Sequence, residues 1–524
     1  MSQQKEIPLM EKIVSLCKRR GFIFQSSEIY GGINGFWDYG PLGAELKRNL
    51  RDTWWRAMTR EREDVVGLDA TIIMHPAIWK ASGHVDTFAD MMLDCKTCKG
   101  RFRADHVQSI PCPQRPSKAV AECHGEKTEP RAFNLMFKSH YGPIESDDNL
   151  CYLRPETAQA IFAQFKNVVD SSRQKVPFGV CQIGKAFRNE ITPRNFTFRS
   201  REFEQMELEF FIKPDEAIEL QYGSVARWFD GADLAEPQPN WGWEMWHRYW
   251  VSQRTAYYHS IGLTSEVLDY HWQTPEELAH YARACVDILF KFPFGTDELE
   301  GIAARGDFDL SAHQDASKKS QEVFDEELRA AANKLDETAR NAFAAKVADD
   351  WAARAQRSGK PEDGARTAAQ EFCEKLFKGN YVPHVIEPSA GLDRLALAIL
   401  ANAYSEVEKT DAKGTTETLT VLRFHPRVAP IKVGVFPLLK NKPELVAKAR
   451  EVYHLLKAHL TAFYDEGASI GKRYARQDEI GTPFCVTIDF DTVGENGPDL
   501  LDTVTLRHRD DGRQERVKIS ELLG

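Results

Sequence analysis

One segment, residues 187–207, constrains the fold of this 524-residue chain more than any other. Residues 187–190 and 199–207 combine aromatic and charged side chains. The stretch between them, 191–198, contains a proline, an arginine and an asparagine, which favour a turn or loop. The segment therefore predicts two strands joined by a loop.

Side chains of a strand alternate between its two faces, and this alternation limits what the two strands can present. Arg199, Phe203 and Glu207 lie four residues apart, so we expect them on one face. Arg188 and Glu190 share a face of the first strand. A guanidinium binds phosphate through paired hydrogen bonds, a ring stacks on a base, and a carboxylate accepts from an exocyclic amine. The pattern predicts a nucleotide site; the alternative is an ordinary charged hairpin.

Length and composition set the class of protein. A chain of 524 residues suggests two to four domains, and 42% hydrophobic with 28% charged residues is a globular composition. The net charge of −10 argues against a histone-like coat of positive charge but leaves local RNA contacts open. Apolar runs are short and Met1–Arg20 is rich in charge, so we expect no membrane span and no signal peptide. Ten cysteines without a secretion signal favour a reducing compartment, and we expect the cytoplasm.

Local patterns divide the chain. Apolar residues at helical spacing predict a long helix from Leu42 to about Arg60, and a strand follows from Val65 to Met74. Residues 88–150 are rich in Cys, basic residues, Pro and Gly, which indicates an insertion. We expect residues 215–292 to be mostly helical. The Ala-, Glu- and Lys-rich block at about 310–378 predicts a second, helical insertion.

A third informative segment is Glu387–Arg394, which opens an apolar helix that continues to Leu400. Gly391 permits close backbone approach just ahead of the helix. Arg394, at the helix start, can reach the far end of a triphosphate. The alternative is a surface arginine at a helix N-terminus.

These segments resemble the three motifs of class II aminoacyl-tRNA synthetases. Residues 42–76 are similar to motif 1, which builds a dimer interface, and 187–207 resemble motif 2. Residues 387–394 resemble motif 3, with Ser389 where the motif usually has its first glycine. That departure, together with the RPETAQ sequence of residues 154–159, resembles the glycyl-tRNA synthetase family, in its single-chain α2 dimer form.

Further segments resemble the same family: residues 94–105, 297–303 and 471–483. The resemblance extends from about residue 8 to residue 520, and the block at about 310–378 matches least. Related class II enzymes that charge threonine, proline, histidine or serine share the motifs and stay open as an alternative. A non-catalytic paralogue, such as a synthetase-like polymerase subunit, is a second alternative.

The resemblance implies an α+β fold, in which a catalytic domain with helical insertions is built on an antiparallel sheet and a mixed α/β anticodon-binding domain follows. The implied catalytic domain consists of residues 1–87, with motif 1, and residues 151–425, with motifs 2 and 3. The Cys-rich insertion 88–150 separates these two parts, and the helical insertion at about 310–378 lies within the second. Residues 428–524 form the implied anticodon-binding domain.

The resemblance also implies a reaction in two steps. Glycine attacks the α-phosphate of ATP, with Mg²⁺ present, to form glycyl-adenylate, and the glycyl group then passes to the 3′ end of tRNA(Gly). Neither step needs a covalent enzyme nucleophile, so positioning and charge neutralisation should carry the rate. The implied partners are tRNA(Gly), glycine, ATP and a second copy of the chain, with no DNA and no membrane.

Roles follow from the motif positions. The implied catalytic residues are Arg188 on the α-phosphate and glycine carboxylate, Glu190 on the adenine amine, and Arg394 on the adenine face or γ-phosphate. Phe203 would stack on adenine, and Glu298 is a candidate Mg²⁺ ligand. The implied ATP-binding set is Arg188, Asn189, Glu190, Phe198, Arg199, Ser200, Arg201, Glu202, Phe203, Glu298, Leu299, Gly391, Leu392, Asp393 and Arg394.

Glycine has no side chain, so a site selects it by excluding anything larger and by gripping both charged ends. The ammonium group needs acidic partners, for which Glu156, Glu207 and Glu387 match the family, and Arg103 would join from the first insertion. Surface ion pairs are the alternative for these glutamates. The implied glycine-binding set is Arg103, Glu156, Phe203, Glu204, Gln205, Met206, Glu207, Glu387, Pro388, Ser389, Ala390 and Gly391.

Two further groups complete the candidates. Cys95, Cys98, Cys112 and Cys123 have spacing similar to a zinc ribbon, although the second pair lacks a CxxC, so a structural Zn²⁺ is a hypothesis. In the C-terminal region, basic residues beside an aromatic side chain suit unpaired RNA bases; a solvated helix face is the alternative. The implied anticodon contacts are Lys472, Arg473 and Arg476.

Overall fold

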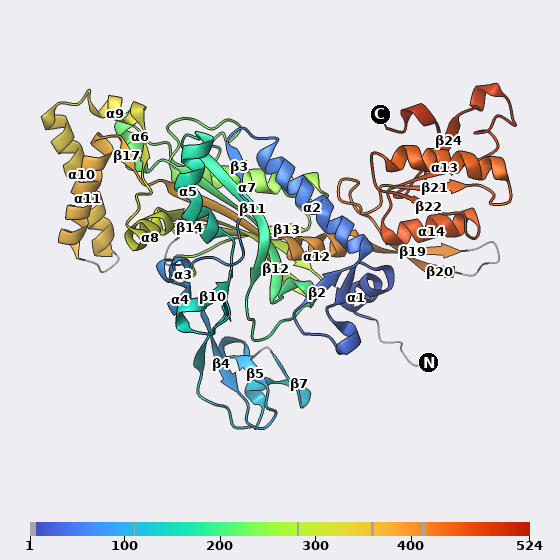
Figure 1. Cartoon of the computed structure of the whole chain (residues 1–524), viewed down its shortest axis with the longest axis horizontal. Coiled ribbons are helices and arrows are strands. Elements are labelled where there is room, and N and C mark those ends of the chain that lie inside the picture. Colours follow the sequence, from blue (N-terminus) through green and yellow to red (C-terminus); the bar gives the residue numbers. More distant parts are fainter. Residues whose placement is uncertain are drawn as a thin grey trace.

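The computed structural model describes residues 7–108, 110–279, 282–357, 361–410, 414 and 416–523. The predicted domain limits at residues 1 and 524 lie outside these ranges. Within them, the largest sheet has the strand order β13–β14–β15–β18–β12–β11–β3, and its neighbouring strands are antiparallel except for β11 and β3 (Figure 1). The strands are β3 (Val65–Gly67), β11 (Phe178–Phe187), β12 (Glu202–Ile212), β13 (Leu268–Trp272), β14 (Ala284–Phe292), β15 (Gly295–Gly306) and β18 (His384–Gly391).

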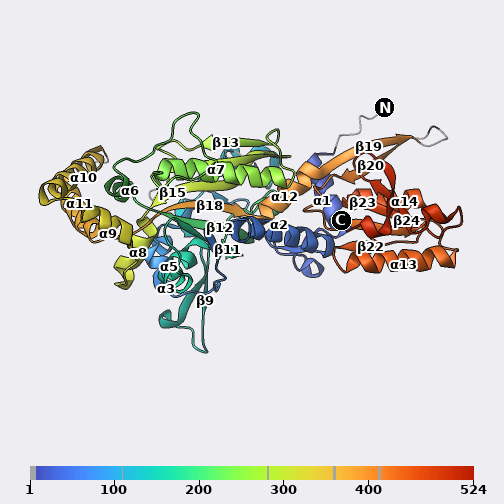
Figure 2. The same cartoon turned by 90° about the horizontal axis from the view of Figure 1, so that it is seen from above.

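Helices cover both faces of this sheet, as Figure 2 shows for α7 on one side and α5 on the other. On the first face, α2, α7 and α12 share one core with alternate β12 residues such as Met206 and Phe210. On the other face, α5 packs its phenylalanines against Phe178 and Phe211. These helices are α2 (Pro41–Thr59), α5 (Ala158–Ser172), α7 (Trp243–Ser260) and α12 (Leu392–Ala403).

The predicted helix from Leu42 to about Arg60 is confirmed by α2, but the strand that follows is shorter than predicted. β3 ends at Gly67, and Ile73 makes only a single bridge to Leu153. The guanidinium of Arg154 donates to the carbonyls of Ala70 and Thr71 at 3.1 and 3.2 Å, so these groups bond to a side chain instead of a neighbouring strand.

Residues 215–292 are helical only in their first part. After α6 (Asp215–Tyr222) and α7, the chain forms β13 and β14. The expectation that this region is mostly helical is therefore wrong for its second half. Val286, Ile288 and Phe290 alternate with more exposed residues because β14 lies inside the sheet.

The Cys-rich segment extends from the sheet as small strands with their own core, built around Leu93, Phe102 and Val120 (Figure 1). Its strands are β4 (Ala89–Asp94), β5 (Arg101–Arg103), β6 (Pro111–Cys112), β7 (Arg115–Ala119) and β8 (Arg131–Asn134), followed by the pair β9 (Phe137–His140) and β10 (Leu150–Leu153). Near its base lie α3 (Pro76–Ala81) and α4 (His84–Thr87).

The block at about 310–378 is helical, as predicted. After α8 (Phe308–Ser317), a two-residue ladder pairs β16 (Val323–Phe324) with β17 (Asn380–Tyr381) and closes the base of a helical excursion. The excursion consists of α9 (Glu326–Ala332), α10 (Glu337–Arg357) and α11 (Glu362–Phe377).

The C-terminal region has a separate core and a sheet of order β22–β21–β23–β24–β25 with parallel and antiparallel pairs. The predicted mixed α/β architecture is therefore confirmed. Its elements are β21 (Val433–Pro437), α13 (Pro443–Lys457), β22 (Ala462–Tyr464), α14 (Ile470–Ile480), β23 (Phe484–Ile488), β24 (Thr503–His508) and β25 (Gln514–Lys518).

The remaining helices and strands lie near the N-terminus of the chain and, in the sequence, between α12 and β21. The hairpin of β19 (Tyr404–Thr410) and β20 (Thr416–Leu422) packs on α14. The N-terminal elements are α1 (Leu9–Arg20), β1 (Ile23–Gln25) and β2 (Trp37–Tyr39). Among the described residues, no helix combines the length and apolar character that a membrane crossing requires.

Candidate active site

A cavity of about 310 Å³ lies over the sheet where β12, β18, β15 and β14 run side by side. Pairing fixes which side chains face it. Glu207 lies opposite Ser389, and Ser389 lies opposite Gly301, so three strands present these residues to the same face. Predicted residues that line the cavity are Arg188, Glu190, Phe198, Arg199, Ser200, Phe203, Gln205, Glu298, Glu387, Ser389, Gly391, Asp393 and Arg394.

The connection between β11 and β12 differs from its prediction. β11 ends at Phe187 and β12 begins at Glu202, so Arg188, Glu190 and Arg199 lie in the connection and not in strands. Asn195 and Phe196 have positive φ angles inside this connection, between Arg194 and Arg199, which form an isolated bridge. Strand alternation therefore cannot place these three side chains, although all three still line the cavity.

Arg188 lies between two aromatic rings. Its guanidinium carbon is 5.3 Å from the ring centre of Phe203 and 5.5 Å from that of Phe88. Its Nε donates to the carbonyl of Pro155 at 3.0 Å, and its backbone N–H donates to the carbonyl of Arg201 at 2.9 Å. These contacts hold the guanidinium beside the Phe203 ring.

Arg394 lines the same cavity from the start of α12. Its guanidinium lies 4.5 Å from the Phe198 ring centre and 3.3 Å from a carboxylate oxygen of Glu298. Glu298 and Asp287 are carboxylates on the cavity lining. Their oxygen atoms suit Mg²⁺, so the donor set fits this ion.

Other members of the predicted ATP set have structural contacts. The backbone N–H of Asn189 donates to the Leu135 carbonyl at 2.7 Å, and Arg201 donates to the carbonyls of Glu190 and Asn34. Glu202 pairs with Lys185. The side chains of Leu299 and Leu392 belong to the apolar core, so a contact of these residues with ATP would have to use their backbone, and it stays a prediction.

Glu207 is buried beneath the cavity and accepts three hydrogen bonds: from the Ser389 hydroxyl at 2.9 Å, from the Thr157 backbone N–H at 3.1 Å and from the Thr157 hydroxyl. Burial, and then the charge of Glu156, raise the pKa of Glu207. The hydrogen bonds fix the carboxylate in place.

Glu387 and Glu156 lie beside it with different partners. Arg305 lies 2.6 Å from Glu387 and also contacts Asp309 at 2.8 Å. Burial raises the pKa of Glu387 to about 8 in spite of Arg305. Burial also acts to raise the pKa of Glu156, but His84, at 3.3 Å, and the nearby arginines outweigh it and lower that pKa.

Four members of the predicted glycine set face away from this cavity. Glu204 lies on the opposite face of β12, where Lys47 and Arg51 of α2 contact it at 3.1 and 3.0 Å. Met206 and Ala390 belong to the core on that face, and Pro388 shares the face of Ala390. Strand alternation turns these four side chains away from the cavity, so they do not face a ligand bound there. A contact through their backbone stays a prediction.

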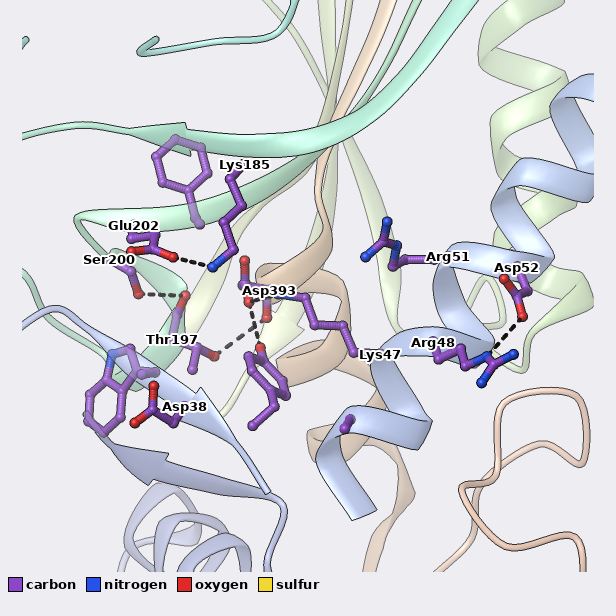
Figure 3. A pocket seen from close by; sticks show the side chains of 14 residues that line it. Asp38, Lys47, Arg48, Arg51, Asp52, Lys185, Thr197, Ser200, Glu202 and Asp393 are labelled. Atoms are coloured by element: carbon purple, nitrogen blue, oxygen red, sulfur yellow. Dashed lines mark hydrogen bonds and ion pairs between the residues drawn. The ribbon is translucent and has the colours of Figure 1, made fainter. Parts of the chain in front are cut away.

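A second cavity, of about 670 Å³, shares Phe203, Thr197, Ser200 and Asp393 with the first. Figure 3 shows its lining, with Asp393 near Lys47 of α2. Asp393 sits at its base, where Tyr39 and Lys47 donate to its carboxylate at 2.7 and 2.8 Å. Its other oxygen accepts from the Glu204 backbone N–H at 2.7 Å. Asp393 therefore joins α2 to the strand and helix that carry Phe203 and Arg394.

Arg103, the predicted substrate contact from the Cys-rich segment, pairs with Asp90 at 3.0 Å and Asp105 at 2.7 Å. Asp105 most strongly, then Asp90 and, more weakly, Glu190 raise the pKa of Arg103 against the effect of burial. A contact with glycine stays a prediction.

The four cysteines of the predicted zinc group come together at the end of this segment. Each of these thiols influences the pKa of at least one of the others, so they lie close together. The backbone N–H of Cys98 lowers the pKa of Cys95 and that of Gln114 lowers the pKa of Cys112, whereas burial raises the pKa of Cys98 and the Cys112 thiol raises that of Cys123. Four clustered cysteines are a donor set of the kind that Zn²⁺ binds.

The three predicted anticodon residues lie in α14 with different environments. Arg473 is only 2% exposed, and its guanidinium donates to the carbonyls of Pro437 and Ala468 at 2.5 and 3.1 Å. The prediction that Arg473 contacts RNA is therefore wrong, because its side chain is used inside the domain. Arg476 pairs with Asp465 and is partly exposed, and Lys472 is exposed.

Several residues at the site were not predicted. Glu209 continues the alternation of Phe203, Gln205 and Glu207, so the period of β12 could have identified it. Arg305 and Asp309 are four residues apart, but no local signal indicates that they lie beside Glu387. Other unpredicted residues in or near the two cavities include Tyr39, Lys47, His84, Thr157, Gln273 and Asp287.

Comparisons with known proteins agree with this geometry. Residues 137–230 match the class II tRNA synthetase core domain of the G, H, P, S and T type, and residues 432–524 match an anticodon-binding domain. The antiparallel sheet, the cavity over it and these two matches define the class of protein as a class II tRNA synthetase.

Full-length relatives narrow the class. The chain is 44% identical to the glycine–tRNA ligase of Treponema denticola, with 98% of this chain and 95% of the relative aligned. Identity is 42% to the Rhodopirellula baltica enzyme, with 98% of both chains aligned, and 43% to that of Thermus thermophilus, with 98% and 97% aligned. The chain belongs to the glycine–tRNA ligase family.

Proposed function

We propose that this chain activates glycine with ATP, in the presence of Mg²⁺, and transfers it to tRNA(Gly). One observation carries the assignment: one cavity brings two arginines and a phenylalanine together with Glu387, and the buried Glu207 and the partly exposed Glu156 are the carboxylates closest to Glu387 in their electrostatic influence. The first group fits a nucleotide, and the second fits an ammonium group that offers no side chain.

The residues of this chain would act by position and charge. Arg188 neutralises the negative charge that develops when the glycine carboxylate attacks the α-phosphate, and Phe203 stacks on adenine beside it. Glu190 accepts a hydrogen bond from the adenine amine. Arg394 would contact the far phosphates, and Glu298 would hold Mg²⁺, which would supply positive charge for the phosphate groups.

Selection of glycine would depend on the carboxylate end of the cavity. Glu207 is fixed by Ser389 and Thr157, so its oxygens are held where they can accept from an ammonium group. Glu387, with its pKa near 8, gains charge as the ammonium group approaches, because an opposite charge favours ionisation. A cavity of this kind grips the amine of an amino acid and gives a larger side chain no favourable partner.

Amino-acid-dependent exchange of pyrophosphate into ATP tests this function. Glycine should support exchange, and threonine, proline, histidine and serine should not. Exchange with one of these four in place of glycine would show a related class II specificity. Absence of exchange with every amino acid, in protein that binds tRNA, would support a non-catalytic paralogue.

The C-terminal region would bind the tRNA anticodon through the exposed side of α14. Lys472→Ala should weaken charging of tRNA(Gly) about two- to tenfold, the effect of losing one phosphate contact, and leave glycine-dependent exchange unchanged. Arg473→Ala is the contrast, because it removes a buried structural contact and should lower the thermal stability of this domain. Equal loss of exchange and charging in Lys472→Ala would argue against an anticodon role.

We also propose that Cys95, Cys98, Cys112 and Cys123 bind one structural Zn²⁺. The metal would supply stability to a segment whose apolar core is small. Metal analysis of purified protein should find about one Zn²⁺ per chain, and Cys95→Ser should lose it and make the segment sensitive to protease. Cys373→Ser is the matched control, since this buried thiol of α11 packs against α10, in a different part of the chain. Full zinc content in Cys95→Ser would remove these cysteines as ligands.

Assembly and location belong to the same proposal. Two copies of the chain would form a homodimer through the region of α2. The enzyme would act in the cytoplasm, where translation takes place. The proposed domains are 1–87, 88–150, 151–425 and 428–524.

A further inference from the structure

Glu209 is a buried carboxyl group that the proposed mechanism does not use. It lies two residues beyond Glu207 on the same face of β12, is 0% exposed, and neither of its oxygens has a hydrogen-bond partner in the described part of the chain. Oxygens of Glu207, Glu209 and Glu387, one from each residue, lie within 4.8 Å of one another. Buried polar atoms are usually paired, so this arrangement calls for an explanation.

The charges around Glu209 are mostly negative. Glu207, Glu387 and Asp309 face it, and Arg305 supplies positive charge but already contacts Glu387 and Asp309. An ionised Glu209 would be a buried anion among anions with no donor, which is strongly unfavourable. Burial most of all, and then Glu387, raise the pKa of Glu209 well above its ordinary range.

We propose that Glu209 carries a proton and, as a neutral acid, positions Glu207 and Glu387 for the ammonium group of glycine. Its O–H donates to a neighbouring carboxylate, directly after a small side-chain rotation or through one water molecule, and the proton stays on Glu209 throughout activation. Glu209 does not touch the substrate and is a positioning residue. The inference rests on the proposed glycine-binding role of its neighbours.

The geometry explains why such a residue is useful. The ammonium group needs negative charge at the cavity surface, yet several buried carboxylates repel one another. A protonated Glu209 behind them replaces a repulsive charge with a donor. The charged and titratable groups that face this region from the surrounding elements are Glu156, Glu207, Arg305, Glu387, Asp309 and His313.

Two substitutions at Glu209 test whether the site needs a neutral hydrogen-bond donor or a negative charge at this position. Glu209→Gln keeps a neutral donor of the same size, so the KM for glycine should stay within about threefold of the wild-type value. Glu209→Leu removes the donor, and the KM for glycine should rise by about tenfold or more with the KM for ATP unchanged, as expected when a bond to a charged group is lost. Glu371→Gln, on the exposed side of α11, is the matched control.

The outcomes decide the inference. A KM for glycine in Glu209→Gln that rises about as much as in Glu209→Leu would show that the charge is required and would overturn it. An unchanged KM in Glu209→Leu would overturn the positioning role. If Glu209→Leu does not fold, Glu209→Gln decides alone by the same criterion.

Thermal unfolding against pH gives a readout independent of activity. The folded-state pKa of Glu209 is raised, so the wild-type protein binds more protons than its unfolded chain, and its stability falls as pH rises above the ordinary glutamate pKa of about 4.3. Glu209→Gln lacks this loss, so its advantage in melting temperature should grow from pH 5 to pH 8. A constant difference would contradict a protonated Glu209. Wild-type protein without glycine-dependent exchange would refute the proposed function and leave this melting test valid.

Discussion

Replacement of Arg188 by alanine should reduce glycine-dependent pyrophosphate exchange about a thousandfold, which corresponds to roughly 4 kcal/mol of transition-state stabilisation. The guanidinium lies beside the Phe203 ring on the cavity lining, where the α-phosphate would bind. Without it, negative charge would develop during the attack without its cation. Exchange assays at saturating ATP and glycine, with single-turnover adenylate formation, measure the effect.

Two comparisons make this result specific. Arg188→Lys keeps the charge but loses the paired hydrogen bonds, so it should recover only part of the activity. Thermal unfolding of Arg188→Ala should stay close to the wild-type curve, because its side chain donates to one carbonyl, that of Pro155, and otherwise lies beside the Phe88 and Phe203 rings at the edge of the cavity. Normal exchange in Arg188→Ala would contradict the role.

Replacement of Arg305 by leucine should have the largest effect on stability. Arg305 is 5% exposed and lies between Glu387 and Asp309, whose side chains are 10% and 2% exposed. Removal of one partner of a buried ion pair leaves an uncompensated charge and typically costs about 3–5 kcal/mol. Urea unfolding followed by tryptophan fluorescence should report a loss of this size.

The pH dependence of that variant has a defined sign. Loss of Arg305 should raise further the pKa of Glu387, which burial already holds at about 8, so the variant should lose more stability than the wild-type protein as pH rises above about 8. Adding Glu387→Gln and Asp309→Asn should restore part of the stability near pH 8. Arg56→Ala is the control, because its pair with Glu61 is exposed and should contribute less than about 1 kcal/mol. A loss no larger than that of the control would refute the buried-pair account.

The sequence predicted those parts of the fold in which one period dominates. The helical spacing of α2 was clear because this helix buries a single face. β14 was missed although its apolar residues alternate, since the tryptophan-rich α7 just before it led us to expect continued helix. The short β3 could not be foreseen, because Arg154, which binds the carbonyls beyond it, comes from more than 80 residues later in the sequence.

The candidate site was predicted in its residue types more than in its geometry. Motif resemblance brought Glu204 and Met206 into the glycine set with Glu207, although alternation places them on the opposite face. Arg473 looked like an RNA contact because Lys472 and Arg476 are also basic, but it shares its helix face with the buried Gln477. Arg305 escaped prediction because only the sheet order brings β15 beside β18.

The ladder between Val323 and Tyr381 has an evolutionary consequence. The chain enters and leaves the α9–α11 excursion at adjacent points, and α10 and α11 share a small core of their own around Val347 and Cys373. Lengthening, shortening or exchange of that outer module can therefore accumulate without shifting β18, which holds Glu387 and Ser389 a few residues further on. The α9–α11 excursion can thus change in length and sequence during evolution, while the residues of β18 that would bind the amino acid are under separate selection.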